Sequence, residues 1–92
     1  MSKNETRKEK VSVYVPAYNA EPYLESCLSA IQHQDYPIEN IYVVNDGSTD
    51  KTEEIARSMG VVVLNQERNM GLGAGRNRAF QTIETPFIAS LD

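Results

Sequence analysis

The 92-residue sequence has no tryptophan, a single cysteine and a single histidine, and these absences limit the chemistry it can carry. Cys27 has no partner for an internal disulfide, which suits a reducing compartment. It stands at helical spacing with Leu24, Leu28 and Ile31, so a small buried apolar residue is favoured over a reactive thiol. His33 falls near the end of an expected helix, and the sequence indicates neither a Ser-His-Asp triad nor a zinc site.

Long apolar runs and an excess of basic residues are also missing. No stretch approaches the roughly 18 apolar residues of a membrane-spanning helix. Residues 1–10 (MSKNETRKEK) have no apolar run, so we expect a flexible tail rather than a signal peptide. The net charge of −4 argues against nucleic acid as a partner, because a nucleic-acid binder would show a basic face. We expect a cytoplasmic location. A longer protein that contains this segment could also be located at the inner face of the membrane.

What is present is a regular alternation of strand and helix patterns, in a length that suits one domain. The four expected strands are runs of β-branched and aromatic residues at 11–15, 41–44, 61–64 and 87–91. The expected helices between them cover 20–34, 50–59 and a segment from the glycine-rich loop at 69–75 to about residue 83.

This alternation predicts an α/β fold. Continuous apolar strands are covered on both faces, so we expect a Rossmann-like parallel sheet with helices on both faces and strand order 3-2-1-4. Pro16 is expected to end the first strand, since proline has no N–H for the ladder. Asp50 and Glu53 have the spacing of a helix capping box, and Gly60 suits the end of the same helix. Phe80 is expected to face inward from the last helix.

Ligands of open parallel sheets bind beyond the carboxyl ends of the strands. Three polar segments fall there: 16–19 (PAYN), 45–48 (NDGS) and Asp92. An aromatic ring and two carboxylates at one rim can stack a base, bond its edge and hold a cation, which outlines a nucleotide-diphosphate site. Plainer interpretations stay open, because Tyr18 could simply cover a helix end and Asp46 could belong to an Asp-Gly turn.

The glycine-rich segment 71–76 (GLGAGR) looks at first like a dinucleotide fingerprint. It departs from that motif because its sixth position is Arg76 and because it follows the third strand instead of the first. The favoured interpretation is a tight helix entry whose backbone N–H groups face the rim, where Arg76 could assist a phosphate. Arg76 could equally be a plain surface charge, which is the expectation for Arg68 and Arg78.

Taken together, four segments resemble glycosyltransferase family 2, whose fold is called GT-A. The resemblance runs from Val11 to Asp92, and its motifs occur in the order of the family. It implies that residues 11–92 form the nucleotide-sugar-binding half of a GT-A domain, truncated before the acceptor-binding half. The segments are VSVYVPAYNAEPYLESCLSAI, IYVVNDGSTDKTEEIA, NMGLGAGRNRA and PFIASLD.

The resemblance implies roles for particular residues in binding a nucleotide sugar. The first nucleotide-contacting motif of the family is matched by Pro16, Ala17, Tyr18 and Asn19. Tyr18 would lie against the base and Glu21 would line the site nearby. Asp46 matches the second aspartate of an Asp-Asp-Gly-Ser motif and would bond the base edge.

The same resemblance implies a divalent metal, Mg²⁺ or Mn²⁺. Asp92 matches the first aspartate of the family's Asp-x-Asp motif, which holds ribose and, through a later carboxylate, the metal that bridges the diphosphate. The sequence departs from the family at Asn45, where an aspartate is usual. This departure has little effect on the expected nucleotide binding if Asp46 makes the contact to the base.

The implied reaction transfers a sugar from a nucleotide diphosphate to an acceptor hydroxyl with inversion, while the metal stabilises the leaving group. The catalytic base is expected downstream, so no catalytic residue is assigned and the fragment is expected to be inactive alone. A sugar nucleotidyltransferase and a non-catalytic nucleotide-binding or interaction module stay open as alternatives. The exposed edge of strand 87–91 predicts a homo-oligomer for the fragment.

Overall fold

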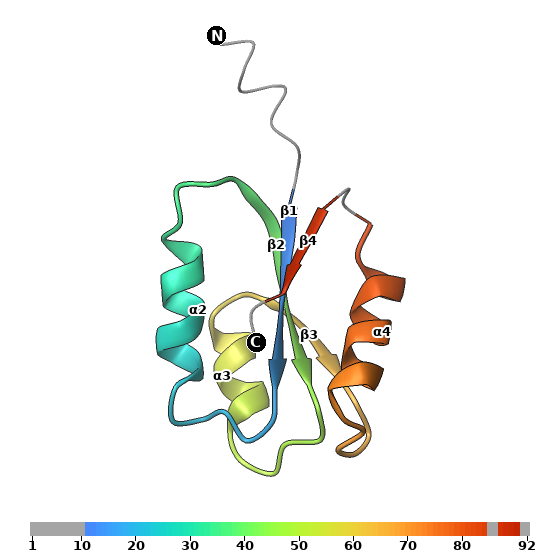
Figure 1. Cartoon of the computed structure of the whole chain (residues 1–92). Helices are drawn as coiled ribbons and strands as arrows, with labels where there is room; N and C mark the ends of the chain where they lie inside the picture. The colour runs from blue at the N-terminus through green and yellow to red at the C-terminus, as the bar shows by residue number, and fades with distance from the viewer. Residues whose placement is uncertain (1–10, 85–86, 91–92) are drawn as a thin grey trace, which may run out of the picture.

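The structure, a computed structural model, describes residues 11–84 and 87–90 of the chain. Strands and helices alternate without exception along these residues, as the sequence predicts (Figure 1). In chain order the elements are β1 (Val11–Ala17), α2 (Leu24–Gln32), β2 (Ile38–Asn45), α3 (Thr52–Ser58), β3 (Val62–Asn65), α4 (Leu72–Thr82) and β4 (Phe87–Ser90).

The four strands form one sheet in the order β3-β2-β1-β4, which is the predicted order. Each neighbouring pair is parallel, and β1 and β2 are in register with Val13 opposite Ile41 and Val15 opposite Val43. Helices α2 and α3 cover one face of the sheet and α4 covers the other (Figure 1). The carboxyl ends of all the strands therefore point toward one edge of the molecule, the lower edge in Figure 1.

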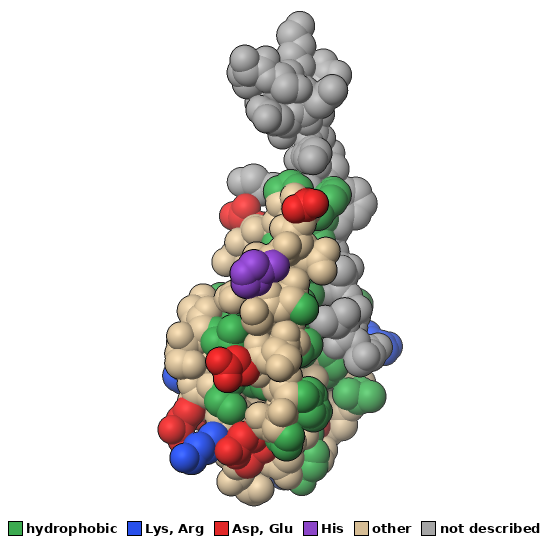
Figure 2. Space-filling model, turned by 90° about the vertical axis from the view of Figure 1, so that its left-hand side faces the viewer, with side chains coloured by type: hydrophobic (Ala, Val, Ile, Leu, Met, Phe, Trp, Pro, Cys, Tyr) green, Lys and Arg blue, Asp and Glu red, His purple; other side chains and the backbone are tan. Residues whose placement is uncertain are grey.

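The face under α2 and α3 carries the larger apolar cluster. Its buried members are Val13, Val15, Ala17, Ala20, Leu24, Leu28, Ile31, Val43 and Ala56. The α2 stripe predicted from helical spacing is thus buried, and Cys27 packs against this cluster as a partly buried residue. Seen from the α2 side, the described surface shows acidic and apolar side chains interspersed, with no continuous basic patch (Figure 2).

The face under α4 carries a smaller cluster of Tyr14, Val44, Ala79 and Ile83. The prediction that Phe80 faces inward was wrong, since it is 54% exposed. Ala79 and Ile83 stand four residues apart and form the buried stripe, which turns Phe80 to the flank. Its ring instead meets the edge of Tyr14, with ring centroids 6.3 Å apart and planes at 85°.

Strand β1 continues through Pro16 to Ala17, although proline was expected to end it. The Ala17 carbonyl accepts the Asp46 N–H at 2.8 Å, so Ala17 faces the β2 side. Polar backbone groups alternate sides along a strand, which turns the missing N–H of Pro16 toward β4. The described pairing of β4 ends with Ser90 opposite Tyr14, so no ladder bond described there needs a donor from Pro16.

The capping-box prediction at the start of α3 was wrong in both halves. The N-cap is Lys51, and Asp50, one residue earlier, accepts the Thr52 N–H at 3.0 Å instead of the Glu53 N–H. The Glu53 carboxylate does not reach back to Asp50, because it accepts hydrogen bonds from Arg57 Nε at 2.9 Å and Asn65 Nδ2 at 3.0 Å. At the other end of the helix, Gly60 has φ +77°, as expected for a helix-ending glycine.

Helix α2 is shorter than predicted, because residues 21–23 form a turn before it. His33 ends the helix, with its Nδ1 2.7 Å from the Ser29 carbonyl oxygen, which confirms its interpretation as a helix-end residue. None of the described helices is both long enough and apolar enough to cross a membrane. The tail 1–10, the last residue of the expected strand 87–91, and Asp92 lie outside the described residues.

Candidate functional site

A cavity of about 240 Å³ opens at the carboxyl ends of β1 and β2, beside the start of α4. Its lining residues are Pro16, Ala17, Tyr18, Tyr23, Val44, Asp46, Gly71, Leu72 and Gly75. The chain leaves β1 toward β2 and β3 on one side, while β4 returns on the other side. The cavity therefore lies at the carboxyl end of β1, beside the switch point between β1 and β4, and open parallel sheets bind their ligands near such a point.

Asp46 is the charged residue of this cavity, and it is only 8% exposed. Its two carboxylate oxygens accept the backbone N–H groups of Met70 at 2.8 Å and Gly71 at 3.0 Å. These bonds fix the loop between β3 and α4 against the end of β2. A carboxylate has about four acceptor positions, so Asp46 keeps capacity for an N–H donor from a ligand.

Gly47 allows this loop to come close. It has φ +73°, and a Cβ at this position would lie 2.4 Å from the carbonyl carbon of Arg68 and 2.5 Å from the backbone nitrogen of Asn69. No side chain fits there without moving backbone. The Asp-Gly pair at 46–47 is therefore more than a turn signal, because both residues hold the same loop.

Asn19 ties the loop after β1 to the loop after β2. Its backbone N–H donates to Ser48 Oγ at 2.9 Å, and its side-chain oxygen accepts the Thr49 N–H at 2.8 Å. Its φ of +49° is one that asparagine tolerates better than most residues. Asn19 is not among the residues that line the cavity, so it acts on the loop rather than on the cavity wall.

Glu21 makes a second, reciprocal tie between the same loops. Its N–H donates to Asp50 Oδ2 at 3.1 Å, and its own Oε1 accepts the Lys51 N–H at 3.1 Å. Desolvation acts to raise the pKa of Asp50. Hydrogen bonds from the Thr52 hydroxyl and from backbone N–H groups, including that of Glu21, outweigh it and hold this pKa below its ordinary 3.8.

Asn45, where the family has aspartate, is a buried hydrogen-bond donor. Its Nδ2 donates to Asn65 Oδ1 at 2.9 Å, and its Oδ1 accepts the Ser48 N–H at 3.3 Å. Asn65 in turn donates to Glu53 at 3.0 Å. Hydrogen bonds from Asn65 and Arg57 lower the pKa of Glu53 below its ordinary value of 4.5. The departure at Asn45 is thus matched by an acceptor on the neighbouring strand.

The structure brings only part of the predicted site together. Pro16, Ala17, Tyr18 and Asp46 share one cavity, and the Tyr18 side chain is 48% exposed there. Asn19 and Glu21 lie in the loop between β1 and α2, outside the lining of the cavity. Arg76 is an exposed residue of α4 outside the lining, and Asp92 lies outside the described residues.

Two lining residues that sequence reasoning missed are Tyr23 and Leu72, which are 58% and 66% exposed. Tyr23 was assigned to a helix from residue 20, whereas it ends a turn before α2. The sequence does contain an indication of this position: Tyr23 directly follows Pro22, and it does not share the helical spacing of the buried residues Leu24 and Leu28. Leu72 begins α4 inside the glycine-rich loop, where an apolar residue has no helical neighbour to cover it.

Comparison with known proteins gives a family match over residues 12–92, to the model described as glycosyl transferase family 2. The chain is 38% identical over 89 residues to glycosyltransferase GlyA of Streptococcus pneumoniae, covering 91% of this chain and 13% of that protein. It is 38% identical over 87 residues to the putative glycosyltransferase EpsH of Bacillus subtilis, covering 89% of this chain and 25% of that protein. The chain thus spans a quarter or less of these relatives.

Solved structures show the same fold. TarS 1–349 of S. aureus in complex with UDP superposes with a TM-score of 0.83 at 36% identity, covering 90% of this chain and 27% of that chain. The mannosyltransferase PcManGT of Pyrobaculum calidifontis, in complex with GDP-Man and Mn²⁺, superposes with a TM-score of 0.81 at 27% identity, covering 88% and 26%.

Proposed function

Because this chain belongs to glycosyltransferase family 2, we propose that residues 11–92 form the nucleotide-sugar-binding half of an enzyme that transfers a sugar to an acceptor hydroxyl. The observation that carries the proposal is the cavity at the switch point. It combines an exposed aromatic ring, Tyr18, with a buried carboxylate, Asp46, whose position is fixed by two backbone N–H groups.

The proposal assigns the base of the nucleotide to this cavity. Tyr18 offers a ring face for stacking, an interaction that is worth about 1–3 kcal/mol per base in other proteins. Asp46 has acceptors only, so it favours a base with an N–H donor on its edge, as uracil and guanine have. UDP and GDP-Man, the ligands of the two solved relatives, both satisfy that condition.

A divalent metal, Mg²⁺ or Mn²⁺, is proposed for the whole enzyme. Among residues 11–84 and 87–90 no group of three His, Cys, Asp or Glu side chains is placed to hold a metal ion. The described residues therefore do not make a metal site by themselves, and Asp92 is the residue of this chain that the proposal assigns to it. Oxygen donors of this kind suit a hard cation.

Direct displacement with inversion requires a base within hydrogen-bond reach of the acceptor hydroxyl. We assign no residue of this chain to that role, and we place the part that holds the reacting acceptor hydroxyl outside residues 11–92. We therefore expect the purified 92-residue chain to bind nucleotide weakly and to transfer no sugar. If the purified chain transferred sugar, and if an Asp46→Asn variant lost this activity, the assignment of the catalytic base to a part outside residues 11–92 would be wrong.

The experiment is calorimetric titration of the chain with UDP and with GDP. Tyr18→Ala and Asp46→Asn should each weaken binding by about tenfold, since stacking or a charge-assisted hydrogen bond is lost. Tyr36→Ala is the matched control, because Tyr36 is 49% exposed and Tyr18 48%. Tyr36 lies at the other end of the sheet. Equal weakening by Tyr18→Ala and Tyr36→Ala would rule out the proposed cavity.

A further inference from the structure

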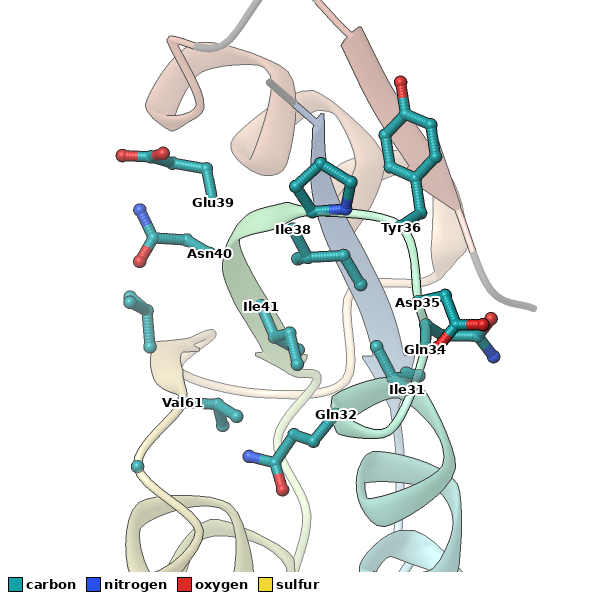
Figure 3. Close-up of a pocket in the computed structure, with 13 residues that line it drawn as sticks. Ile31, Gln32, Gln34, Asp35, Tyr36, Ile38, Glu39, Asn40, Ile41 and Val61 are labelled. Atoms are coloured by element: carbon teal, nitrogen blue, oxygen red, sulfur yellow. The ribbon is translucent and has the colours of Figure 1, made fainter. Parts of the chain in front are cut away.

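A second, larger cavity of about 430 Å³ lies at the opposite end of the sheet (Figure 3). It is formed by the end of α2, the turn after it, the start of β2 and the segment that enters β3. Its lining residues are Ile31, Gln32, Gln34, Asp35, Tyr36, Pro37, Ile38, Glu39, Asn40, Ile41, Gly60, Val61 and Val62. Its volume is within the range of about 300–1,000 Å³ that ligand pockets occupy.

This cavity is separate from the proposed nucleotide site. Residues Ile38–Ile41 line it, while Val44 and Asp46 line the other cavity. Their nearest lining residues on β2, Ile41 and Val44, are three residues apart, or about 10 Å at roughly 3.3 Å per residue, and the two cavities have no lining residue in common.

The floor of the cavity is apolar and its rim is polar. Figure 3 shows Ile31, Ile38, Ile41 and Val61 pointing toward the middle. Amide and carboxylate side chains extend outward from this floor, those of Glu39 and Asn40 to one side and those of Gln34 and Asp35 to the other, with the ring of Tyr36 at the outer end. A ligand that fits has one apolar face and an edge rich in hydrogen-bonding groups.

The chemistry of the lining selects among such ligands. None of the described lining residues is Lys, Arg or His, so a phosphate or another anion finds no cation among them. Amides both donate and accept, and carboxylates accept strongly from hydroxyl groups. A neutral pyranose ring has the matching parts, because its C–H face is apolar, its hydroxyls form the edge, and an exposed tyrosine ring offers further contact.

Part of the cavity wall is already held in place. Gln32 Nε2 donates to the Met59 carbonyl oxygen at 2.9 Å, which joins the ends of α2 and α3. The Gln34 N–H donates to the Ile31 carbonyl at 3.2 Å, which fixes the first residue of the turn. Because this part of the wall is ordered before binding, a ligand loses less free energy to ordering the protein.

We propose that this amino-end cavity binds a neutral saccharide at a place remote from the nucleotide cavity. In an enzyme that extends or modifies a glycan, such a site holds a distant part of the acceptor polymer on the protein. The assignment of ligand class stands on the lining residues alone. It does not depend on nucleotide binding at the other end.

The test is NMR titration of the isotope-labelled 92-residue chain with chitotetraose and cellotetraose, and separately with UDP. The tetrasaccharides should shift the amides of Ile38–Ile41 and Tyr36. Tyr36→Ala should weaken saccharide binding by about fivefold, the loss expected for one ring contact, and should leave UDP binding unchanged. Tyr18→Ala should do the opposite, so that failure of either site is seen independently of the other.

Three results would overturn the proposal. The first is the absence of shifts around the amino-end cavity at millimolar tetrasaccharide. The second is tetrasaccharide shifts confined to the nucleotide cavity. The third is tighter binding of a lysine-rich peptide than of either tetrasaccharide in this cavity, because that would identify an acidic docking surface instead of a saccharide site.

Discussion

Gly47 and Gly60 offer a test of how closely the loop after β3 packs on the end of β2. Both glycines have a left-handed backbone, with φ +73° and +77°. A Cβ on Gly60 meets nothing within 4 Å, whereas a Cβ on Gly47 meets backbone atoms of Arg68 and Asn69 at 2.4 and 2.5 Å. Replacing each glycine with alanine therefore separates backbone strain from steric overlap.

Gly60→Ala should lower the free energy of unfolding by about 1–2 kcal/mol, the penalty for a side chain in the left-handed region. Gly47→Ala carries the same penalty and also moves the loop by about 1 Å, from an overlap at 2.4 Å to ordinary contact at 3.4 Å. That movement strains the two hydrogen bonds to Asp46, and bonds to charged groups are worth about 1.5–3 kcal/mol each. The expected loss is about 3–5 kcal/mol.

Urea unfolding followed by circular dichroism measures both values. For a domain of this size each 1 kcal/mol corresponds to about 4–8 °C in Tm, so a difference of about 2.5 kcal/mol between the two variants should appear as about 10–20 °C in thermal unfolding. Where Gly47→Ala remains folded, the amide resonances of Met70 and Gly71 should shift and UDP binding should weaken. Equal destabilisation by the two variants would refute the reasoning, because it would mean that the loop does not press on Gly47.

Three further predictions concern the strand ends, the acidic loop and assembly. Asn45→Asp should destabilise the fold by about 1–3 kcal/mol in urea unfolding, because a carboxylate cannot donate to Asn65; unchanged stability would contradict the assigned donor. Folding lowers the pKa values of Asp50 and Glu53, so the stabilising effect of each is present above its ordinary value, 3.8 for Asp50 and 4.5 for Glu53, and is lost as the pH falls through its lowered value. Asp50→Asn and Glu53→Gln should make the free energy of unfolding depend less on pH in this acidic range, as measured by urea unfolding at a series of pH values. An unchanged dependence on pH would show that these two carboxylates do not stabilise the fold in this way. The edge strand β4 (Phe87–Ser90) should support self-association, which light scattering across a dilution series detects; a concentration-independent monomer mass with β4 ordered would show this to be wrong.

The sequence predicted the layers and the strand order because those depend on strongly patterned residues. The runs at Val11–Val15 and Ile41–Val44 are apolar on both faces, and that property alone requires helices on each side of the sheet. The errors came where a local rule depends on surroundings. Proline ends a strand only if the missing N–H falls on a paired side, and Pro16 has it toward β4, where the described pairing stops at Tyr14.

The sequence correctly predicted that Tyr18 and Asp46 meet at the carboxyl ends of the strands. It named Asn19 and Glu21 as site residues but did not predict that they act between loops. The contacts of Asn19 and Glu21 with the loop after β2 join positions 29 to 30 residues apart, and spacing in the sequence carries no sign of them. Tyr23 was missed for a related reason, since its position depends on where α2 begins.

The hydrogen bonds among the three rim loops have a consequence for how this surface can change. Side chains of one loop hold the backbone of the next, from Asn19 and Glu21 to the loop after β2 and from Asp46 to the loop after β3. A substitution of one of these residues is therefore expected to disturb the neighbouring loop as well, because each loop is held by side chains of another. Variation in ligand preference is left to side chains that project from these loops, of which Tyr23 and Leu72 are the most exposed at the cavity.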